Sequence, residues 1–101
     1  MANAGLYEVD SKDSENERVW IRFYLSIRTA ITLKIYASDG ETLEREITTG
    51  ELEIGEYTSR ANSVFWDCAT SGGSPVASGV KYVGLFIGSD RQDWVKFYIN
   101  D

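Results

Sequence analysis

The chain has 101 residues, of which 43% are hydrophobic, and its 16 Asp and Glu outnumber its 10 Lys and Arg to leave a net charge of −6. One domain is expected for this length, the apolar fraction excludes a disordered chain, and no apolar run is long enough to span a bilayer. The negative charge argues against nucleic acid and anionic membranes as partners. The first ten residues lack the basic start and apolar stretch of a signal peptide. A complete chain is therefore expected in the cytoplasm or a virion, and a fragment of a secreted protein outside the cell.

Alternation of apolar and polar residues with a period of two runs through the chain and predicts strands. After a weakly alternating start at residues 1–9, clear strands are predicted over 19–27 (VWIRFYLSI) and 31–37 (ITLKIYA). Asp39 and Gly40 then predict a tight turn, because such turns need positive φ. The remaining strands are predicted at 42–48, 51–54, 62–67, 79–88 and 93–100, with a hairpin loop GSDRQ before the last. We therefore predict one domain over residues 1–101, an all-β antiparallel Ig-like or fibronectin-III-like sandwich of about seven strands.

Few residues of this chain are suited to chemistry. The acidic stretch 10–18 predicts a solvated loop between strands, with calcium binding as the alternative; Lys12 stands where a calcium ligand would be needed, and the stretch has no glycine. Cys68 is the only cysteine, so no disulfide forms within the chain, and a small half-buried thiol is expected. The chain has no histidine, the commonest general base and metal ligand. We therefore expect no enzyme activity, cofactor or metal.

The sequence SVFWDCATSGGSPVASGVKY joins the end of one strand to the start of the next and contains the only proline. Trp66 is expected to turn its ring inward, and Asp67 to accept hydrogen bonds from N–H groups of the loop that follows. Gly73 gives the loop backbone freedom, Pro75 preorganises the return, and Gly79 permits close approach where the next strand begins. These five residues are therefore predicted to build the fold.

This arrangement resembles the Ig-like domain of the flagellar hook-capping protein family, a module also found at the ends of secreted bacterial proteins, including type IX sorting domains. The family pattern is roughly Trp-Asp-Gly, a polar loop with Gly, and then Pro-Val-x-Ser-Gly-Val-Tyr. Residues 19–46 are similar to the family's preceding strand pair, so the likeness covers about 19–99. It implies an Ig-like sandwich and says little about the task. Cys68 replaces the family's glycine, and Lys81 replaces a tyrosine expected to point inward.

Aromatic residues are predicted on the outer surface in unusual number. The resemblance implies a register in which the residues two, four and six after Gly79 point inward, and it makes strands 31–37, 79–88 and 93–100 neighbours in one sheet. Five rings then fall on the outer face of that sheet: Tyr36, Tyr82, Phe86, Trp94 and Tyr98. The other sheet is predicted to expose Trp20, Tyr24 and Phe65. Such rings either stabilise the sheet as cross-strand pairs or contact a partner.

We therefore expect a structural or assembly module that binds protein, its own copies among the candidates, as a component of a virion, filament or cell surface. Binding would use the five rings of the first sheet and strand edges, with residues 1–9 as a segment for exchange. The alternative is a carbohydrate-binding module that stacks sugars on Trp94 and Tyr82. Protein ranks first because the predicted rings spread over both sheets instead of forming one line.

Overall fold

The structure of the protein, a computed structural model, describes residues 3–7, 9, 19–58, 64–66, 72–73 and 79–99. Within these ranges every regular element is a strand. The same ranges therefore contain no apolar helix that could cross a membrane. The predictions for the acidic stretch 10–18 and for Asp67, Cys68 and Pro75 lie outside the described residues.

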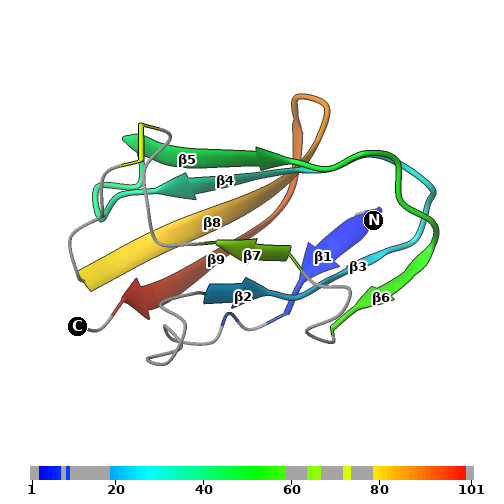
Figure 1. Ribbon diagram of the computed structural model, residues 1–101, viewed down its shortest axis with the longest axis horizontal. Coiled ribbons are helices and arrows are strands. Elements are labelled where there is room, and N and C mark those ends of the chain that lie inside the picture. Colours follow the sequence, from blue (N-terminus) through cyan, green and yellow to red (C-terminus); the bar gives the residue numbers. More distant parts are fainter. Residues whose placement is uncertain are drawn as a thin grey trace.

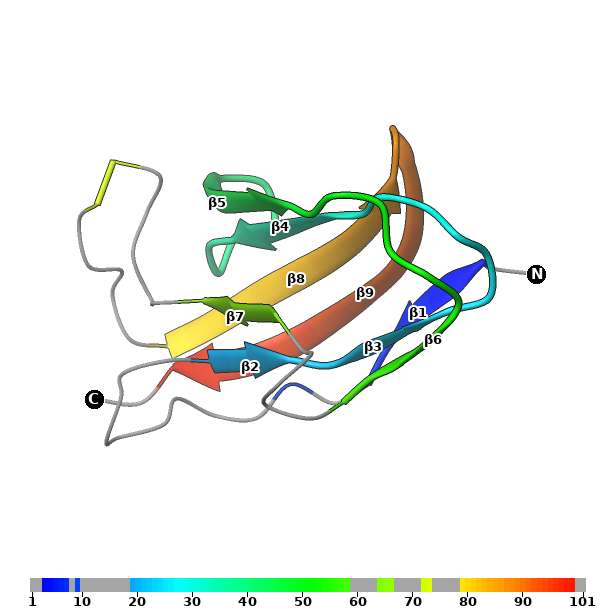
Figure 2. The ribbon, with the colours of Figure 1, turned by 45° about the vertical axis from the view of Figure 1, so that its right-hand side comes forward.

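The described strands form two layers of antiparallel sheet (Figure 1). Their bounds are β1 (Ala4–Leu6), β2 (Val19–Ile21), β3 (Phe23–Leu25), β4 (Thr32–Tyr36), β5 (Leu43–Thr48), β6 (Gly55–Tyr57), β7 (Val64–Trp66), β8 (Gly79–Ile87) and β9 (Asp90–Ile99). One layer is a four-stranded sheet in the order β5, β4, β8, β9; the other contains β1, β3 and β6 in that order, together with the pair β2 and β7. Figure 2 shows the long strands β8 and β9 passing behind β7 and β2 of the other layer. The predicted all-β, sandwich-like architecture is confirmed.

The predicted strand 19–27 is interrupted in the structure, and this break together with β1 at the start of the chain raises the number of strands in the described residues from about seven to nine. Its first half, β2, pairs with β7, while its second half, β3, pairs with β1 and β6. The break falls at Arg22, where the partner changes. Ile27, predicted to point inward, is 37% exposed, because β3 ends at Leu25 and the chain then leaves the sheet.

The core lies between the two layers and follows the predicted alternation closely. The fully buried side chains come from both layers and include Val19, Ile21, Phe23, Ile31, Leu33, Ile35, Val83 and Leu85. The Trp66 ring is only 1% exposed and meets the Phe97 ring edge-on at a centroid distance of 6.1 Å. Removing these apolar surfaces from water is the main favourable contribution to folding.

The hairpin between β8 and β9 is tighter than predicted. Two residues, Gly88 and Ser89, join the strands in place of the five-residue loop, and Gly88 has a φ of 61°. The register then shifts: Leu85 pairs with Asp93, and Phe86 pairs with Arg91. Gln92, between these two partners, is therefore the extra residue of a β-bulge, which changes the direction of the neighbouring side chains.

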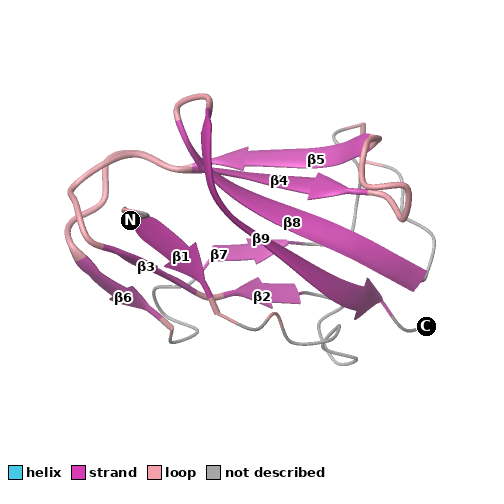
Figure 3. Cartoon of the chain, turned by 180° about the vertical axis from the view of Figure 1, so that it is seen from behind, coloured by secondary structure: helices cyan, strands magenta, loops and turns pink. Residues whose placement is uncertain are grey.

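This bulge ties the N-terminal strand β1 to β9. The amide of Asn3 donates to Gln92 Oε1 at 2.9 Å, and the amide of Leu6 donates to Asp93 Oδ2 at 2.7 Å. Seen from behind in Figure 3, β1 lies between β3 and β9. Residues 1–9 were expected to offer a free edge for strand exchange. In the structure β1 pairs with β3, and its outward amide at Leu6 is already satisfied.

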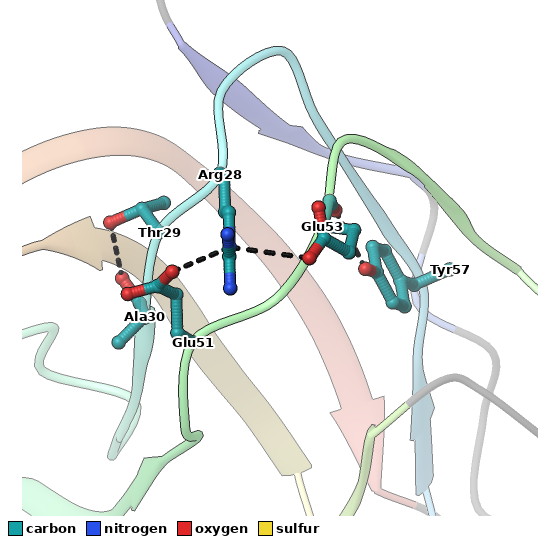
Figure 4. Close-up of polar contacts among 6 residues, drawn as sticks. All are labelled: Arg28, Thr29, Ala30, Glu51, Glu53 and Tyr57. Carbon is teal, nitrogen blue, oxygen red and sulfur yellow. Dashed lines mark hydrogen bonds and ion pairs between the residues drawn. The ribbon is translucent and has the colours of Figure 1, made fainter.

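The connection between β5 and β6 carries the chain from one layer to the other. Thr29 and Leu52 exchange backbone hydrogen bonds of 2.9 and 3.0 Å, and the Tyr57 hydroxyl donates to the Glu53 carbonyl (Figure 4). Leu52 packs against the core, and Tyr57 stacks on Phe23.

Ile54, which alternation puts on the same side as Leu52, is instead 66% exposed. Leu52 and Tyr57 both pack against the core although an odd number of positions separates them. Strict alternation would put two such residues on opposite sides, so it is broken between them, and Ile54 turns outward.

Candidate functional site

The predicted aromatic residues of the four-stranded sheet come from adjacent strands. Strand pairing sets their outward side chains in three rows across β4, β8 and β9, which are Tyr36, Tyr82 and Lys96; Lys34, Gly84 and Trp94; and Thr32, Phe86 and Arg91. We call the surface formed by Tyr36, Tyr82, Phe86, Trp94, Tyr98, Lys34, Arg91 and Lys96 the aromatic face. Tyr98 lies one row further along β9, opposite Val80.

Trp94 is at the centre of the aromatic face. Its ring lies 5.1 Å from that of Tyr36 and 5.5 Å from that of Tyr82, with which it is stacked. Gly84 makes this possible, because a Cβ there would lie 3.2 Å from Trp94 Cε3 and 2.7 Å from Phe86 Cε1. The rings thus lie flat over a glycine, and each such pair contributes about 0.5–1.5 kcal/mol beyond its buried area.

This packing limits how far the rings protrude. Of the five predicted contact residues, Tyr98 is 52% exposed, whereas Tyr36, Tyr82, Phe86 and Trp94 are half-buried against one another. The aromatic face is therefore a platform of rings that pack against one another.

Cations lie over the rings of this platform. Lys34 Nζ is 4.6 Å from the Phe86 centroid, and Arg91 Cζ is 5.0 Å from the Trp94 centroid. Lys96 Nζ lies 5.8 Å from the Tyr98 ring. Attraction to the ring quadrupole is worth about 0.5–1 kcal/mol at exposed sites. In a protein of net charge −6, three cations thus gather around one aromatic surface.

A hollow of about 600 Å³ opens on the aromatic face and is lined by Tyr36, Gly40, Glu41, Phe86, Arg91 and Trp94. One wall is the turn between β4 and β5, where Gly40 has a φ of 71°. Asp39 holds this turn: its carboxylate accepts hydrogen bonds from the hydroxyl and amide of Thr42 and from the amide of Glu41. The same hydrogen bonds, led by that from the Thr42 hydroxyl, lower the pKa of Asp39 to about 2. These hydrogen bonds lie within the turn and fix its shape beside the hollow.

The second layer presents a smaller aromatic group. Tyr24 covers Gly5, where any Cβ would collide with its ring, and the Tyr7 ring lies 5.8 Å away. The Tyr7 hydroxyl donates to Glu56 Oε1 at 2.7 Å, which raises the pKa of Tyr7. Trp20 is half-buried opposite Phe65, whose side chain lies outside the described part of the structure.

Both layers thus place an aromatic ring over a glycine of the neighbouring strand, Tyr24 over Gly5 and Trp94 over Gly84. Sequence reasoning missed this pairing. A strand glycine in register with an aromatic residue is the signal that would have revealed it.

The predicted structural motif is only partly described. Trp66 is buried, Gly73 has a φ of 88°, and Gly79 has a φ of 123° at the start of β8.

In the described ranges no three Asp, Glu or Cys side chains gather as a metal site. No protein-family model matches the chain, and no curated protein matches its sequence.

Proposed function

We propose that the protein is a non-catalytic assembly module whose aromatic face binds another protein, copies of the same chain included. The observation that carries this proposal is the platform around Trp94: stacked rings with Lys34, Arg91 and Lys96 over or beside them. Aromatic residues and arginine are enriched where proteins meet, and rigid rings lose little conformational entropy on binding.

The finer fold assignment belongs to the same proposal. We take β2 with β3, and β6 with β7, as two interrupted strands, which leaves seven. Phe23 pairs with Tyr57 and Ile21 pairs with Val64. Only Arg22 separates the first residue of each pair, whereas several residues of the sequence separate Tyr57 from Val64, and this difference in length accounts for the interruption. The layers are then a three-stranded and a four-stranded sheet, as in fibronectin-type and Ig-like sandwiches, and this arrangement supports the resemblance to the hook-capping family.

Carbohydrate binding is the second candidate, because the hollow beside Trp94 combines ring surfaces with the polar groups of Glu41 and Arg91. Sugar stacking needs an open ring face. Here Arg91 lies over Trp94 and Lys34 lies over Phe86, so a neutral sugar would have to compete with these cations, whereas a protein can offer carboxylates that pair with them. Protein therefore remains the favoured partner.

The test reverses charges at the rim and leaves the rings intact. Light scattering coupled to gel filtration compares the parent with Lys34→Glu/Lys96→Glu, and with Lys34→Arg/Lys96→Arg as the matched control. We expect the parent and the arginine variant to assemble and the glutamate variant to assemble less. Equal assembly of all three, or retention of a monomeric parent on a polysaccharide column, would contradict protein binding by this face.

A further inference from the structure

We propose that the partner is a second copy of this chain, docked head to tail, with Ile54 of one copy in the hollow beside Trp94 of the next. This inference rests on the proposed function and names the occupant of its binding face. Two surfaces of the chain carry the inference, one on each side of the contact.

The first surface is Ile54 itself. Its side chain is 66% exposed, the largest exposed fraction among the large hydrophobic residues in the described part of the chain. The segment that presents it is fixed on both sides, by the backbone bonds between Leu52 and Thr29 and by the stacking of Tyr57 on Phe23 at 4.9 Å. Ile54 is therefore held outward as a rigid apolar projection.

Carboxylates stand on either side of this projection in the sequence. Glu51 and Glu53 flank Arg28, whose Nε lies 2.5 and 3.2 Å from their Oε1 atoms (Figure 4). Two carboxylates against one guanidinium leave the residues on either side of Ile54 with a net negative charge.

The second surface, the hollow beside Trp94, complements Ile54 in its apolar character and in its charge. The hollow has an aromatic floor formed by Tyr36, Phe86 and Trp94, which suits an apolar side chain, and Arg91 and Glu41 also line it. Lys34, over Phe86, adds a second cation, so the cations at the hollow outnumber its one carboxylate. Opposed potentials of this kind select partner and register.

The two surfaces lie on different parts of one molecule. The hollow is on the outer face of the four-stranded sheet, whereas Ile54 precedes β6 in the other layer (Figure 1). A contact between Ile54 of one copy and the hollow of another therefore joins two different surfaces and is heterologous. Such contacts build closed rings or open filaments.

The experiment blocks each surface separately. Ile54→Ser removes the projection, Arg91→Glu reverses the charge at the hollow, and Ile54→Leu is the matched control. Circular dichroism checks that each variant is folded. In sedimentation velocity over a concentration series, we expect the parent and Ile54→Leu to grow beyond a dimer, and each blocked variant to associate about tenfold or more weakly. An equimolar mixture of the two blocked variants retains one complete contact and should form a 1:1 dimer that grows no further.

A parent that stops at a dimer, or assembly that is lost in Ile54→Ser but kept in Arg91→Glu, overturns the head-to-tail contact at the hollow. Assembly that persists in Ile54→Ser but is lost in Arg91→Glu overturns this inference and leaves the proposed function in place. Assembly unchanged in both variants overturns both. A parent that stays monomeric across the series overturns the head-to-tail contact, and retention of that monomer on a polysaccharide column then overturns the proposed function as well.

Discussion

Lys81 Nζ lies 2.8 Å from Glu44 Oε1, and the two side chains are 5% and 15% exposed. The register of β4 and β5 explains how they meet. Ile35 pairs with Arg45 and Tyr36 with Leu43, so Glu44 is the extra residue of a bulge. The bulge lets the carboxylate reach past the end of β4 to Lys81 on β8. A buried ammonium group is costly without such a partner.

We predict that Lys81→Met destabilises the protein by about 3–5 kcal/mol, because it leaves the Glu44 carboxylate buried without a counter-charge. Urea denaturation measures the free energy of unfolding. The control is Lys81→Met/Glu44→Leu, which removes both charges and should recover most of the loss. A double variant as unstable as the single one would show that the pair is not the cause.

Trp66→Ala is expected to cost about 3–5 kcal/mol, the range for emptying a large aromatic site in a core. The ring is 1% exposed and packs edge-on against Phe97, so little can fill the space. So large a loss can unfold a domain of this size. A variant that melts at the temperature of the parent would refute the assignment of Trp66 to the core.

Gly84→Ala should disturb the aromatic face, because the new methyl group would meet the rings of Phe86 and Trp94. Overpacking of this kind costs about 1–3 kcal/mol. We expect a lower melting temperature together with a changed tryptophan signal in near-ultraviolet circular dichroism. Gly50→Ala is the matched control, since no atom lies within 4 Å of the position a Cβ would take there. Identical spectra for both variants would mean that the rings do not rest on Gly84.

Asp39 predicts a pH dependence. Its pKa is lowered from the usual 3.8 to about 2 in the folded protein, so its hydrogen bonds stabilise the fold above pH 3.8 and are lost as the pH falls through 2. The parent should therefore be more stable than Asp39→Ala near neutral pH. The difference should shrink as the pH falls through that window. Denaturation of both proteins at a series of pH values measures this, and a difference that does not vary with pH would exclude the carboxylate as its source.

Much of the fold could be predicted because period-two alternation depends on burial alone. Val83, Leu85 and Phe97 are inside for that reason, and the rings of β4, β8 and β9 are on the opposite side. The break at Arg22 and the bulge at Glu44 could not be predicted, because they depend on which strand pairs with which. The exposure of the rings also could not be predicted, since Trp94 is covered by Tyr36 and Tyr82 from the neighbouring strands and by Arg91 across the bulge of its own strand.

Burial of the aromatic face in an assembly is the central claim, and hydroxyl-radical labelling with mass spectrometry tests it most directly. The parent is labelled when dilute and again when concentrated, and oxidation of each aromatic residue is compared. We predict that Trp94 and Tyr98 are oxidised less in the concentrated protein, while Trp20 on the other layer is oxidised equally in both. Equal oxidation of Trp94 and Tyr98 at the two concentrations, or protection of Trp20 alone, would contradict assembly through this face.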